Sequence, residues 1–257
     1  MQIRMPLRLR NLKDSGKKRL FVIPYIFTFA NACLGFLAVL YAWDDCCRNA
    51  SYCIMLAALA DALDGRLARA LGSCSSLGME LDSLCDAISF CFAPAIMLYA
   101  VYLCNSGVLG IIVAGTYLCA GLFRLAKFNN TATQQKSFFM GMSTPVSAIF
   151  FAMVIIDQSW LESSWFGFMF HPYLFLPLVL FFAYLMVSHI KFPTFKTGLS
   201  NHPLTLGAGI AMVLTGIVAG LLHIPVAMAV LAAYICSAIL YHLFYCARIP
   251  HVFKARN

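Results

Sequence analysis

The chain has 257 residues, of which 62% are hydrophobic and only 11% are charged. An ordinary soluble domain is about half apolar and about a quarter charged, so this composition excludes a soluble globular protein. The net charge of +8 would suit nucleic-acid binding, but the basic residues lie between apolar segments, as in the cytoplasmic loops of membrane proteins. We therefore expect an integral membrane protein with no nucleic-acid partner.

The amino-terminal segment, residues 1–19, is strongly basic and carries seven Lys and Arg residues just before the first apolar run. Such a segment is attracted to anionic lipid, so we expect it to be amphipathic and to lie on the cytoplasmic membrane surface. No small-residue cleavage site closes the apolar run that follows, which favours a retained anchor over a signal peptide.

Apolar runs separated by short polar breaks predict an all-α, polytopic transmembrane helix bundle of about eight spans. These spans form a single transmembrane catalytic domain, 20–246, followed by a short basic cytoplasmic tail, 247–257. We expect the spans near residues 20–43, 50–70, 82–104, 107–127, 143–160, 172–190, 204–222 and 225–246.

The basic residues also predict the orientation of these spans. Lys and Arg in short loops stay inside, and with eight spans only Arg48 of the 18 basic residues falls in an outer loop. Both termini and the inner ends of the second and third helices are therefore expected in the cytoplasm. In a bacterium this would be the cytoplasmic side of the cell inner membrane.

Four aspartates stand inside or beside the second and third spans, where each ionisable group costs about 2.5–3.5 kcal/mol on insertion scales. Asp61 and Asp64 are three residues apart, and Asp82 and Asp86 are four apart, so each pair lies on one helical face. The short connection over 71–78 makes a hairpin that brings the pairs together. Four close carboxylates need cations, and oxygen ligands suit Mg²⁺, Mn²⁺ or Ca²⁺.

Two hypotheses from other classes stay open on this spacing. A cation- or proton-coupled transporter also uses membrane acids, although an ion path should place polar groups at several depths, and these acids gather at one inner edge. A purely structural membrane subunit would leave the acidic cluster unexplained.

Cys46 and Cys47 fall in a predicted outer loop, where a disulfide is conceivable, but cysteines of such a chain are more commonly small core residues.

Small and basic residues surround the acids. Gly65 and Ala68 follow Asp64 on its helix, and Gly78 ends the hairpin, which leaves room for a bulky ligand to approach the backbone. Small residues also serve plain helix packing in membranes. Arg69 supplies positive charge suited to phosphate, with anchoring at the inner face as the alternative.

The pattern Asp61-x2-Asp64-Gly65-x2-Ala68-Arg69-x8-Gly78-x3-Asp82-x3-Asp86 resembles the complete signature of the CDP-alcohol phosphotransferases. The resemblance implies a six-helix membrane core, usually in a homodimer. It also implies transfer of a phosphatidyl group from CDP-diacylglycerol, or of a phosphobase from a CDP-alcohol, to an alcohol, with release of CMP.

The resemblance further implies roles for individual residues. Asp61, Asp64 and Asp82 would hold two divalent metal ions, Mg²⁺ or Mn²⁺, that bind the diphosphate. Asp86 would complete the metal site and act as the general base. Gly65, Ala68, Arg69 and Gly78 would bind CDP-diacylglycerol.

Four further stretches resemble the phosphatidylserine synthase branch of that family, namely residues 27–39, 82–99, 123–130 and 185–196. They imply L-serine as acceptor and phosphatidylserine as product. Two positions depart from the branch, which often has Arg where Lys127 stands and Gly where Cys91 stands. Glycerol 3-phosphate, an inositol phosphate or choline therefore stay open as other acceptors.

Polar residues at the other inner helix ends complete the predicted site. Thr28 and Asn31, three residues apart on the first helix, could contact cytidine or its phosphates, or could equally make helix-to-helix hydrogen bonds. Arg124 is the first choice for the carboxylate of serine or the phosphate, and Lys191 is the second. Both have inner-face anchoring as an equal alternative.

Overall fold

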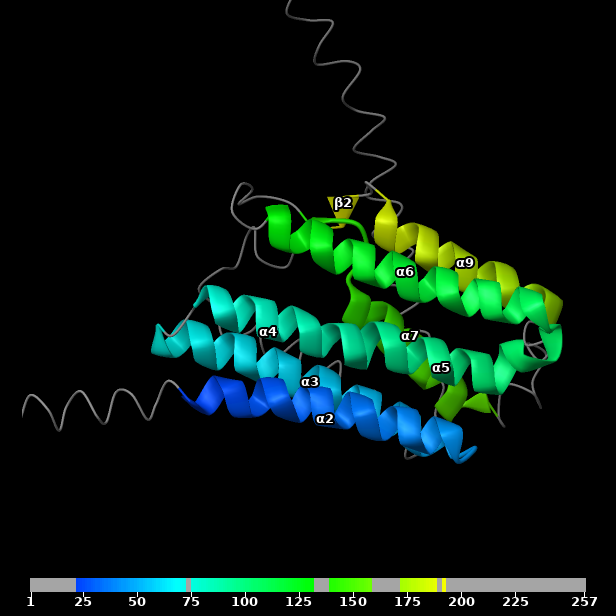
Figure 1. The fold of residues 1–257 in the computed structure, drawn as a ribbon, viewed down its shortest axis with the longest axis horizontal. Helices are drawn as coiled ribbons and strands as arrows, with labels where there is room; N and C mark the ends of the chain where they lie inside the picture. The colour runs from blue at the N-terminus through cyan, green and yellow to red at the C-terminus, as the bar shows by residue number, and fades with distance from the viewer. Residues whose placement is uncertain (1–21, 73–74, 132–138, 159–171, 189–190, 193–257) are drawn as a thin grey trace, which may run out of the picture.

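The computed structural model describes residues 22–72, 75–131, 139–158, 172–188 and 191–192. These parts form six helical rods that lie roughly parallel or antiparallel to one another (Figure 1). The third rod is continuous but changes its helix type several times. The helices are α2 (Val22–Trp43), α3 (Cys47–Leu71), α4 (Ser76–Asp86), η1 (Ala87–Phe92), α5 (Ala93–Leu98), η2 (Tyr99–Leu103), η3 (Cys104–Ser106), α6 (Val108–Thr131), α7 (Thr144–Ile156) and α9 (Pro172–Val187).

The described part of the chain is helical apart from one very short strand pair. Strands β1 (Phe139–Met140) and β2 (Lys191–Phe192) pair in antiparallel fashion, with Phe139 opposite Phe192 and Met140 opposite Lys191. This ladder joins the segments before α7 and after α9. The predicted all-helical architecture is confirmed for the described rods, with this small addition.

Three of the described rods are long and apolar enough to cross a membrane: Pro24–Trp43, Ser76–Ser106 and Val108–Asn130. Helices α7 and α9 are apolar but shorter. Helix α3 is long, but its second half carries the acidic and basic residues of the predicted site. The expected spans at 204–222 and 225–246 lie outside the described residues, so the eight-span count and the number of core helices stay predictions.

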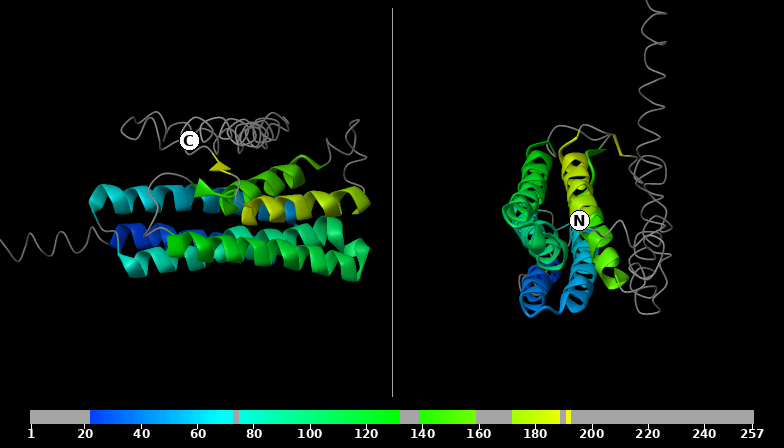
Figure 2. Two further views of the ribbon diagram at one scale, coloured as in Figure 1. Left: turned by 90° about the horizontal axis from the view of Figure 1, so that it is seen from above. Right: turned by 90° about the vertical axis from the view of Figure 1, so that its right-hand side faces the viewer.

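The rods pack in pairs around a common core. Helices α2 and α3 run side by side along most of their length, α4 and η1 also contact α2, α3 contacts α7, and α6 contacts α9. The end-on view of Figure 2 shows these helices grouped around one another. Aromatic rings fill part of the core, where Phe151 packs against Tyr117 and Phe182 with centroid separations of 5.7 and 4.8 Å.

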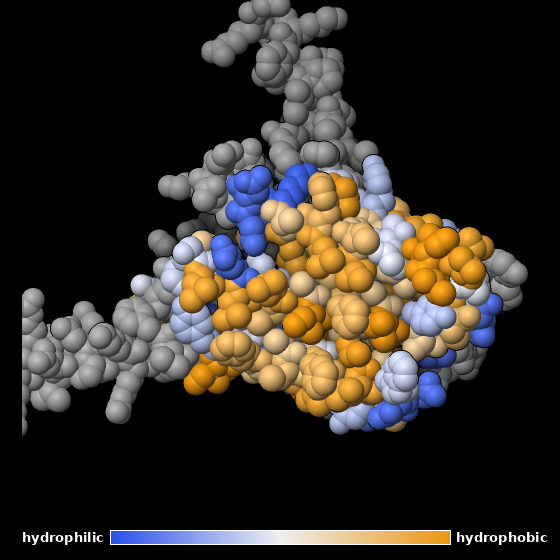
Figure 3. Space-filling view, in the orientation of Figure 1, coloured by the Kyte–Doolittle hydropathy of each residue, from blue (hydrophilic) through white to orange (hydrophobic). Residues whose placement is uncertain are grey.

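The face of the bundle that Figure 3 shows is largely apolar. Figure 3 shows a broad hydrophobic face over the middle of the rods, with hydrophilic side chains gathered toward their ends. Exposed apolar residues on α2 include Ile26, Phe29 and Phe36, each more than half accessible. A surface of this kind is unfavourable in water and matches the hydrocarbon core of a bilayer, which agrees with the predicted membrane protein.

Helix η1 is a π-helix that begins directly after Asp86. Two glycines on neighbouring helices let it approach closely: a side chain at Gly35 of α2 would overlap Ser89, and one at Gly121 of α6 would lie 2.6 Å from Sγ of Cys91. The widened turn is therefore held between α2 and α6. Such π-bulges are frequent at functional sites. This one forms the segment that directly follows Asp86, the fourth aspartate of the pattern.

Candidate active site

The hairpin between α3 and α4 is shaped by backbone signals at both of its ends. Helix α3 ends at Gly72, whose φ of 62° is left-handed and whose N–H donates to the carbonyls of the last turn, as is typical of a glycine that ends a helix. Helix α4 begins after Ser75, whose Oγ accepts from the backbone N–H of Gly78 at 2.9 Å. The carboxyl end of α3 and the amino end of α4 therefore lie together.

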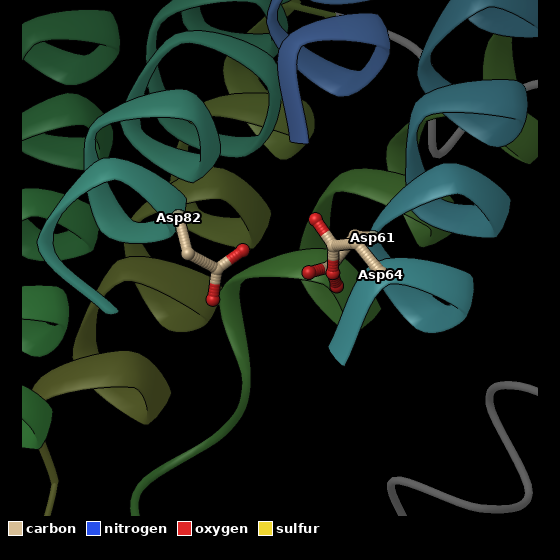
Figure 4. Close-up of side chains that lie close together, drawn as sticks. All are labelled: Asp61, Asp64 and Asp82. Carbon is tan, nitrogen blue, oxygen red and sulfur yellow. The ribbon is translucent and has the colours of Figure 1, made fainter. Parts of the chain in front are cut away.

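Three of the four predicted aspartates converge at this hairpin. One carboxylate oxygen from each of Asp61, Asp64 and Asp82 lies within 4.8 Å of the other two. Figure 4 shows Asp61 and Asp64 of α3 and Asp82 of α4 pointing toward one another. Among the described residues this is the one group of this kind, and the sequence predicted it from helical spacing.

The chemistry of this group fits a divalent cation. Asp64 is only 3% exposed, and both of its carboxylate oxygens, like Oδ1 of Asp82, are buried without a hydrogen bond of good geometry, although the Thr28 side chain lies near Asp64. Buried carboxylate oxygens without partners are costly. Hard oxygen ligands on two facing helices would be satisfied by Mg²⁺ or Mn²⁺.

Asp86 lies beside these three aspartates and is held by a residue of another helix. Its Oδ1 accepts a hydrogen bond of 3.0 Å from the side-chain amide of Asn31 on α2, and it is not one of the three residues whose oxygens converge. Its charge still interacts with those of Asp61 and Asp82. Three carboxylates thus converge, and the fourth interacts with them while an amide orients it.

The two polar residues predicted on the first helix have different surroundings. The hydroxyl of Thr28 donates to the carbonyl of Pro24 within α2 at 3.1 Å. The side-chain amide nitrogen of Asn31 donates the hydrogen bond to Asp86 that joins α2 to α4. Of the two predicted roles of Asn31, this nitrogen therefore has the helix-to-helix hydrogen bond. Its Oδ1 is buried and has no hydrogen-bond partner, which leaves one acceptor of this side chain for a ligand.

The small residues of the pattern divide into two kinds. A side chain at Gly65 would meet only the guanidinium of Arg69, with Nη1 3.5 Å away, so the space beside it is otherwise open. At Gly78 a side chain would lie 3.1 Å from Oγ of Ser75 and 3.6 Å from the hydroxyl of Tyr25. Close packing at the start of α4 is therefore enough to explain why residue 78 is a glycine.

The positive charge of Arg69 acts on the converging carboxylates. Its charge interacts favourably with Asp61, Asp64 and Asp82, while its side chain remains exposed. An exposed guanidinium beside an acidic site can bind an oxyanion that enters from the solvent. Ala68, the neighbour of Arg69 in the pattern, is partly buried on the same helix.

The predicted acceptor residues are placed unequally. Arg124 of α6 is partly buried, donates from Nη1 to the hydroxyl of Thr144 at 3.4 Å, and has a buried Nε without a hydrogen-bond partner. Its charge interacts with that of Asp86, so it lies on the Asp86 side of the site. For Lys191 the structure describes only the backbone pairing with Met140 in the β ladder.

Two other sequence features have a physical account. The thiol of Cys91 lies close to α6 because residue 121 is glycine, which explains how this chain accommodates a side chain where the similar branch often has Gly. Cys46 and Cys47 are free thiols, so the structure contains no disulfide at these two positions.

Sequence reasoning missed three residues that hold the site together. The Tyr25 hydroxyl lies 3.0 Å from Oγ of Ser75, and the buried Ser89 hydroxyl donates to the backbone carbonyl of Asn31 at 2.8 Å. The partners are 50 and 58 residues apart in the chain, so periodicity could not pair them. The capping position of Ser75 just before an apolar run was the one available signal.

The fold and the site define a helical membrane protein with a cluster of aspartates, on two helices, that could hold a divalent cation. Residues 21–187 match the family model described as CDP-alcohol phosphatidyltransferase. The chain belongs to this family, whose members are in general dependent on divalent metals. The resemblance of the aspartate pattern to this family is confirmed, and the protein is a membrane transferase of phospholipid biosynthesis.

Similar proteins match between 54% and 69% of the chain. The chain is 33% identical over 181 residues, which are 69% of this chain and 74% of the relative, to a Helicobacter pylori protein named CDP-diacylglycerol–serine O-phosphatidyltransferase. A Bacillus subtilis protein of the same name is 34% identical over 174 residues, 68% of this chain and 91% of that protein. An archaetidylserine synthase of Methanothermobacter thermautotrophicus is 32% identical over 140 residues, 54% of this chain and 59% of that protein.

Proposed function

We propose that the chain transfers the phosphatidyl group of CDP-diacylglycerol to the hydroxyl of L-serine, forming phosphatidylserine and CMP with the help of a divalent metal. The observation that carries this proposal is the convergence of Asp61, Asp64 and Asp82 beside Asp86. The printed names of the relatives support serine as the acceptor, and the archaeal relative is also named for a serine lipid.

On the donor side, Asp61, Asp64 and Asp82 would hold two Mg²⁺ or Mn²⁺ ions, and Asp86 would complete this metal site. When bound, such an ion neutralises charge on a diphosphate and on its leaving group. Arg69 would bind a phosphate oxygen from the solvent side, and the open space at Gly65 would let the diphosphate approach the backbone of α3. Ala68 would be the second small residue on that approach. Gly78 would contribute through the packing of α4.

On the acceptor side, Asp86 would act as the general base. A serine hydroxyl is a very weak acid, so a carboxylate has to take its proton as the oxygen attacks phosphorus. The new bond joins the serine oxygen to the phosphorus that carries diacylglycerol, and the bond from that phosphorus to the bridging oxygen breaks. CMP leaves with the electron pair, and the proton resides on Asp86 until it passes to solvent.

The remaining polar residues would orient the two substrates. Asn31 has a buried Oδ1 without a partner, suited to a donor group on cytidine, and Thr28 lies beside it on α2. Arg124 has a buried Nε without a hydrogen-bond partner and would pair with the carboxylate of serine. Lys191 is the second candidate for that carboxylate.

We further propose that residues 20–246 form one transmembrane catalytic domain between the cytoplasmic segments 1–19 and 247–257, and that the protein is a homodimer. Both termini and the acidic site would face the cytoplasm. Reporter fusions after residue 257 and in the 44–46 loop between α2 and α3 should give opposite locations. Chemical cross-linking in native membranes should trap a species of twice the monomer mass.

The acceptor can be tested directly with purified protein in detergent. CDP-diacylglycerol and Mn²⁺ are supplied with L-serine, glycerol 3-phosphate, inositol, inositol phosphate or choline in separate reactions, and CMP release is measured. We expect release with L-serine and none above background with the others. Release with a different acceptor alone would replace serine and retain the transferase, whereas uptake of cations by proteoliposomes without CMP release would favour the transporter.

A further inference from the structure

Asp86, the proposed base, belongs to a closed ring of contacts with Asn31 and Ser89. Asn31 of α2 donates from its side-chain amide to Oδ1 of Asp86 at 3.0 Å. Three residues beyond Asp86, the hydroxyl of Ser89 in η1 donates to the backbone carbonyl of the same Asn31 at 2.8 Å. One residue of α2 is thus attached at two points to the segment that carries the base, once through its side chain and once through its main chain.

Both residues that flank Asp86 in these contacts are buried, since Asn31 and Ser89 are 0% exposed. The hydrogen bond from Ser89 to Asn31 is therefore shielded from water, whereas the bond from Asn31 to Asp86 is partly buried. One turn after Asn31, Gly35 lacks the side chain that would overlap Ser89, and this allows α2 to approach η1 closely enough for the Ser89 hydrogen bond. The π-helical turn begins immediately after Asp86 and brings Ser89 to this face.

The Ser89 hydrogen bond is dispensable for the helix that accepts it. The Asn31 carbonyl lies inside α2, where a helical carbonyl already accepts from the N–H four residues later and has a second lone pair for Ser89. Removal of the hydroxyl therefore leaves no unsatisfied carbonyl. What it removes is a restraint on where Asn31 stands relative to the Asp86 segment.

We propose that Ser89 is a positioning residue that acts through Asn31 to hold the Asp86 carboxylate in the orientation that takes the proton of the acceptor hydroxyl. This proposal rests on the proposed function of Asp86 as the base. With Oδ1 engaged by Asn31, the other oxygen of Asp86 is the one directed to the acceptor. A misplacement of about 1 Å of a reacting group can cost about 100-fold in rate.

The test compares Ser89→Ala with Ser51→Ala. Ser51 is a matched control because it is also 0% exposed and its hydroxyl donates to a backbone carbonyl, that of Cys47 in its own helix, at 2.9 Å. For both variants, kcat, the KM for CDP-diacylglycerol and the melting temperature in detergent are measured. We expect Ser89→Ala to lower kcat about 10-fold to 100-fold, with KM and melting temperature close to those of Ser51→Ala and wild type.

A double-mutant cycle tests whether Ser89 acts through Asn31. Residual CMP release by Asn31→Ala and by the double variant is followed with radiolabelled CDP-diacylglycerol. We expect Ser89→Ala to have little further effect once Asn31 is alanine, because groups that act as a unit are not additive. Independent, multiplicative effects on kcat would overturn the proposal.

The outcomes separate this inference from the function on which it rests. If wild-type protein releases no CMP with any acceptor, the proposed function fails. If wild-type protein turns over and Ser89→Ala has the same kcat, or loses kcat only in proportion to lost folded protein, the positioning role is wrong and the transferase stands. If serine is replaced by another acceptor, the same comparison is made with that acceptor.

Discussion

The hydroxyl of Tyr25 on α2 lies 3.0 Å from Oγ of Ser75, the residue that caps the amino end of α4. The same Oγ accepts from the backbone N–H of Gly78. One serine oxygen therefore starts the helix that carries Asp82 and ties that start to α2. The distance between Asp82 and the aspartates of α3 depends on where α4 begins. The contact between Tyr25 and Ser75 therefore helps to set the positions of the three converging aspartates.

Ser75→Ala should destabilise the protein through the loss of this cap. Removing a serine N-cap costs about 1 kcal/mol, which corresponds to a fall of about 2–4 °C in melting temperature for a chain of this size. The neighbouring exposed residue provides the control, since Ser76→Ala leaves the cap intact. Equal melting temperatures for the two variants in detergent would argue against the capping role.

Gly35→Ala and Gly115→Ala should have opposite consequences. A Cβ at Gly35 would overlap the Ser89 hydroxyl and stand 2.7 Å from its Cα, whereas nothing lies within 4 Å of a Cβ at Gly115. Overpacking at Gly35 should cost about 1–3 kcal/mol. Alanine at Gly115, inside α6, should be neutral or should stabilise by up to about 1 kcal/mol through helix propensity.

Thermal melting of the purified variants checks this pair. The contact predicts a lower melting temperature for Gly35→Ala alone, accompanied by reduced turnover because η1 would have to move away from α2. A Gly35→Ala protein as stable and active as Gly115→Ala would mean that the two helices do not approach as described.

Removal of divalent metal should abolish activity. Asp64 and Asp82 have buried carboxylate oxygens without hydrogen-bond partners, and a carboxylate oxygen of Asp61 converges on them. These three like charges need a cation, so EDTA should stop CMP release and added Mn²⁺ or Mg²⁺ should restore it. Asp64→Asn should weaken Mn²⁺ binding about tenfold or more, measured by electron paramagnetic resonance of bound Mn²⁺ without substrate. Asp44→Asn, an exposed aspartate beyond the end of α2, serves as control, and full turnover in excess EDTA would contradict the metal site.

Arg124→Gln should impair use of serine more than use of the lipid donor. A hydrogen bond to a charged group is worth about 1.5–3 kcal/mol, which predicts an increase in the KM for serine of about 10-fold to 100-fold. Arg124→Lys should restore only part of this, because Lys lacks the planar bidentate geometry of Arg.

The comparison for Arg124 uses Arg48→Gln, which changes an exposed arginine at the start of α3. We expect its kinetic constants to match those of wild type, and the KM for CDP-diacylglycerol to stay within about twofold in both variants, since the predicted partner is the serine carboxylate. An equal rise in both KM values for Arg124→Gln would assign this residue to the donor or to general packing.

The acidic site could be predicted because its information is local. Asp61 and Asp64 share a helix, Asp82 follows after a short hairpin, and helical spacing alone places their side chains on facing surfaces. Apolar runs also predicted the rods, with α2 and α6 beginning within two residues of the expected positions. The hydrogen bond that orients Asp86 was not visible from spacing, because its donor, Asn31, belongs to a different helix.

Other features required tertiary information or a different local signal. The third rod begins at Ser76 and not at residue 82, because a polar capping serine and not the first apolar residue determines its start. The π-helical turn after Asp86 has the same apolar composition as an α-helix, so hydropathy cannot distinguish it. The Ser89 contact depends on a glycine 54 residues away in the chain.

The central claim is that Asp86 takes the proton of serine during metal-assisted phosphatidyl transfer. The direct measurement follows isotopically labelled L-serine into lipid with CDP-diacylglycerol and Mn²⁺, using wild type and Asp86→Asn side by side. The account predicts equimolar phosphatidylserine and CMP from wild type, and a folded variant of unchanged melting temperature that forms neither. Full turnover by Asp86→Asn, or no labelled lipid from active wild type, would contradict it.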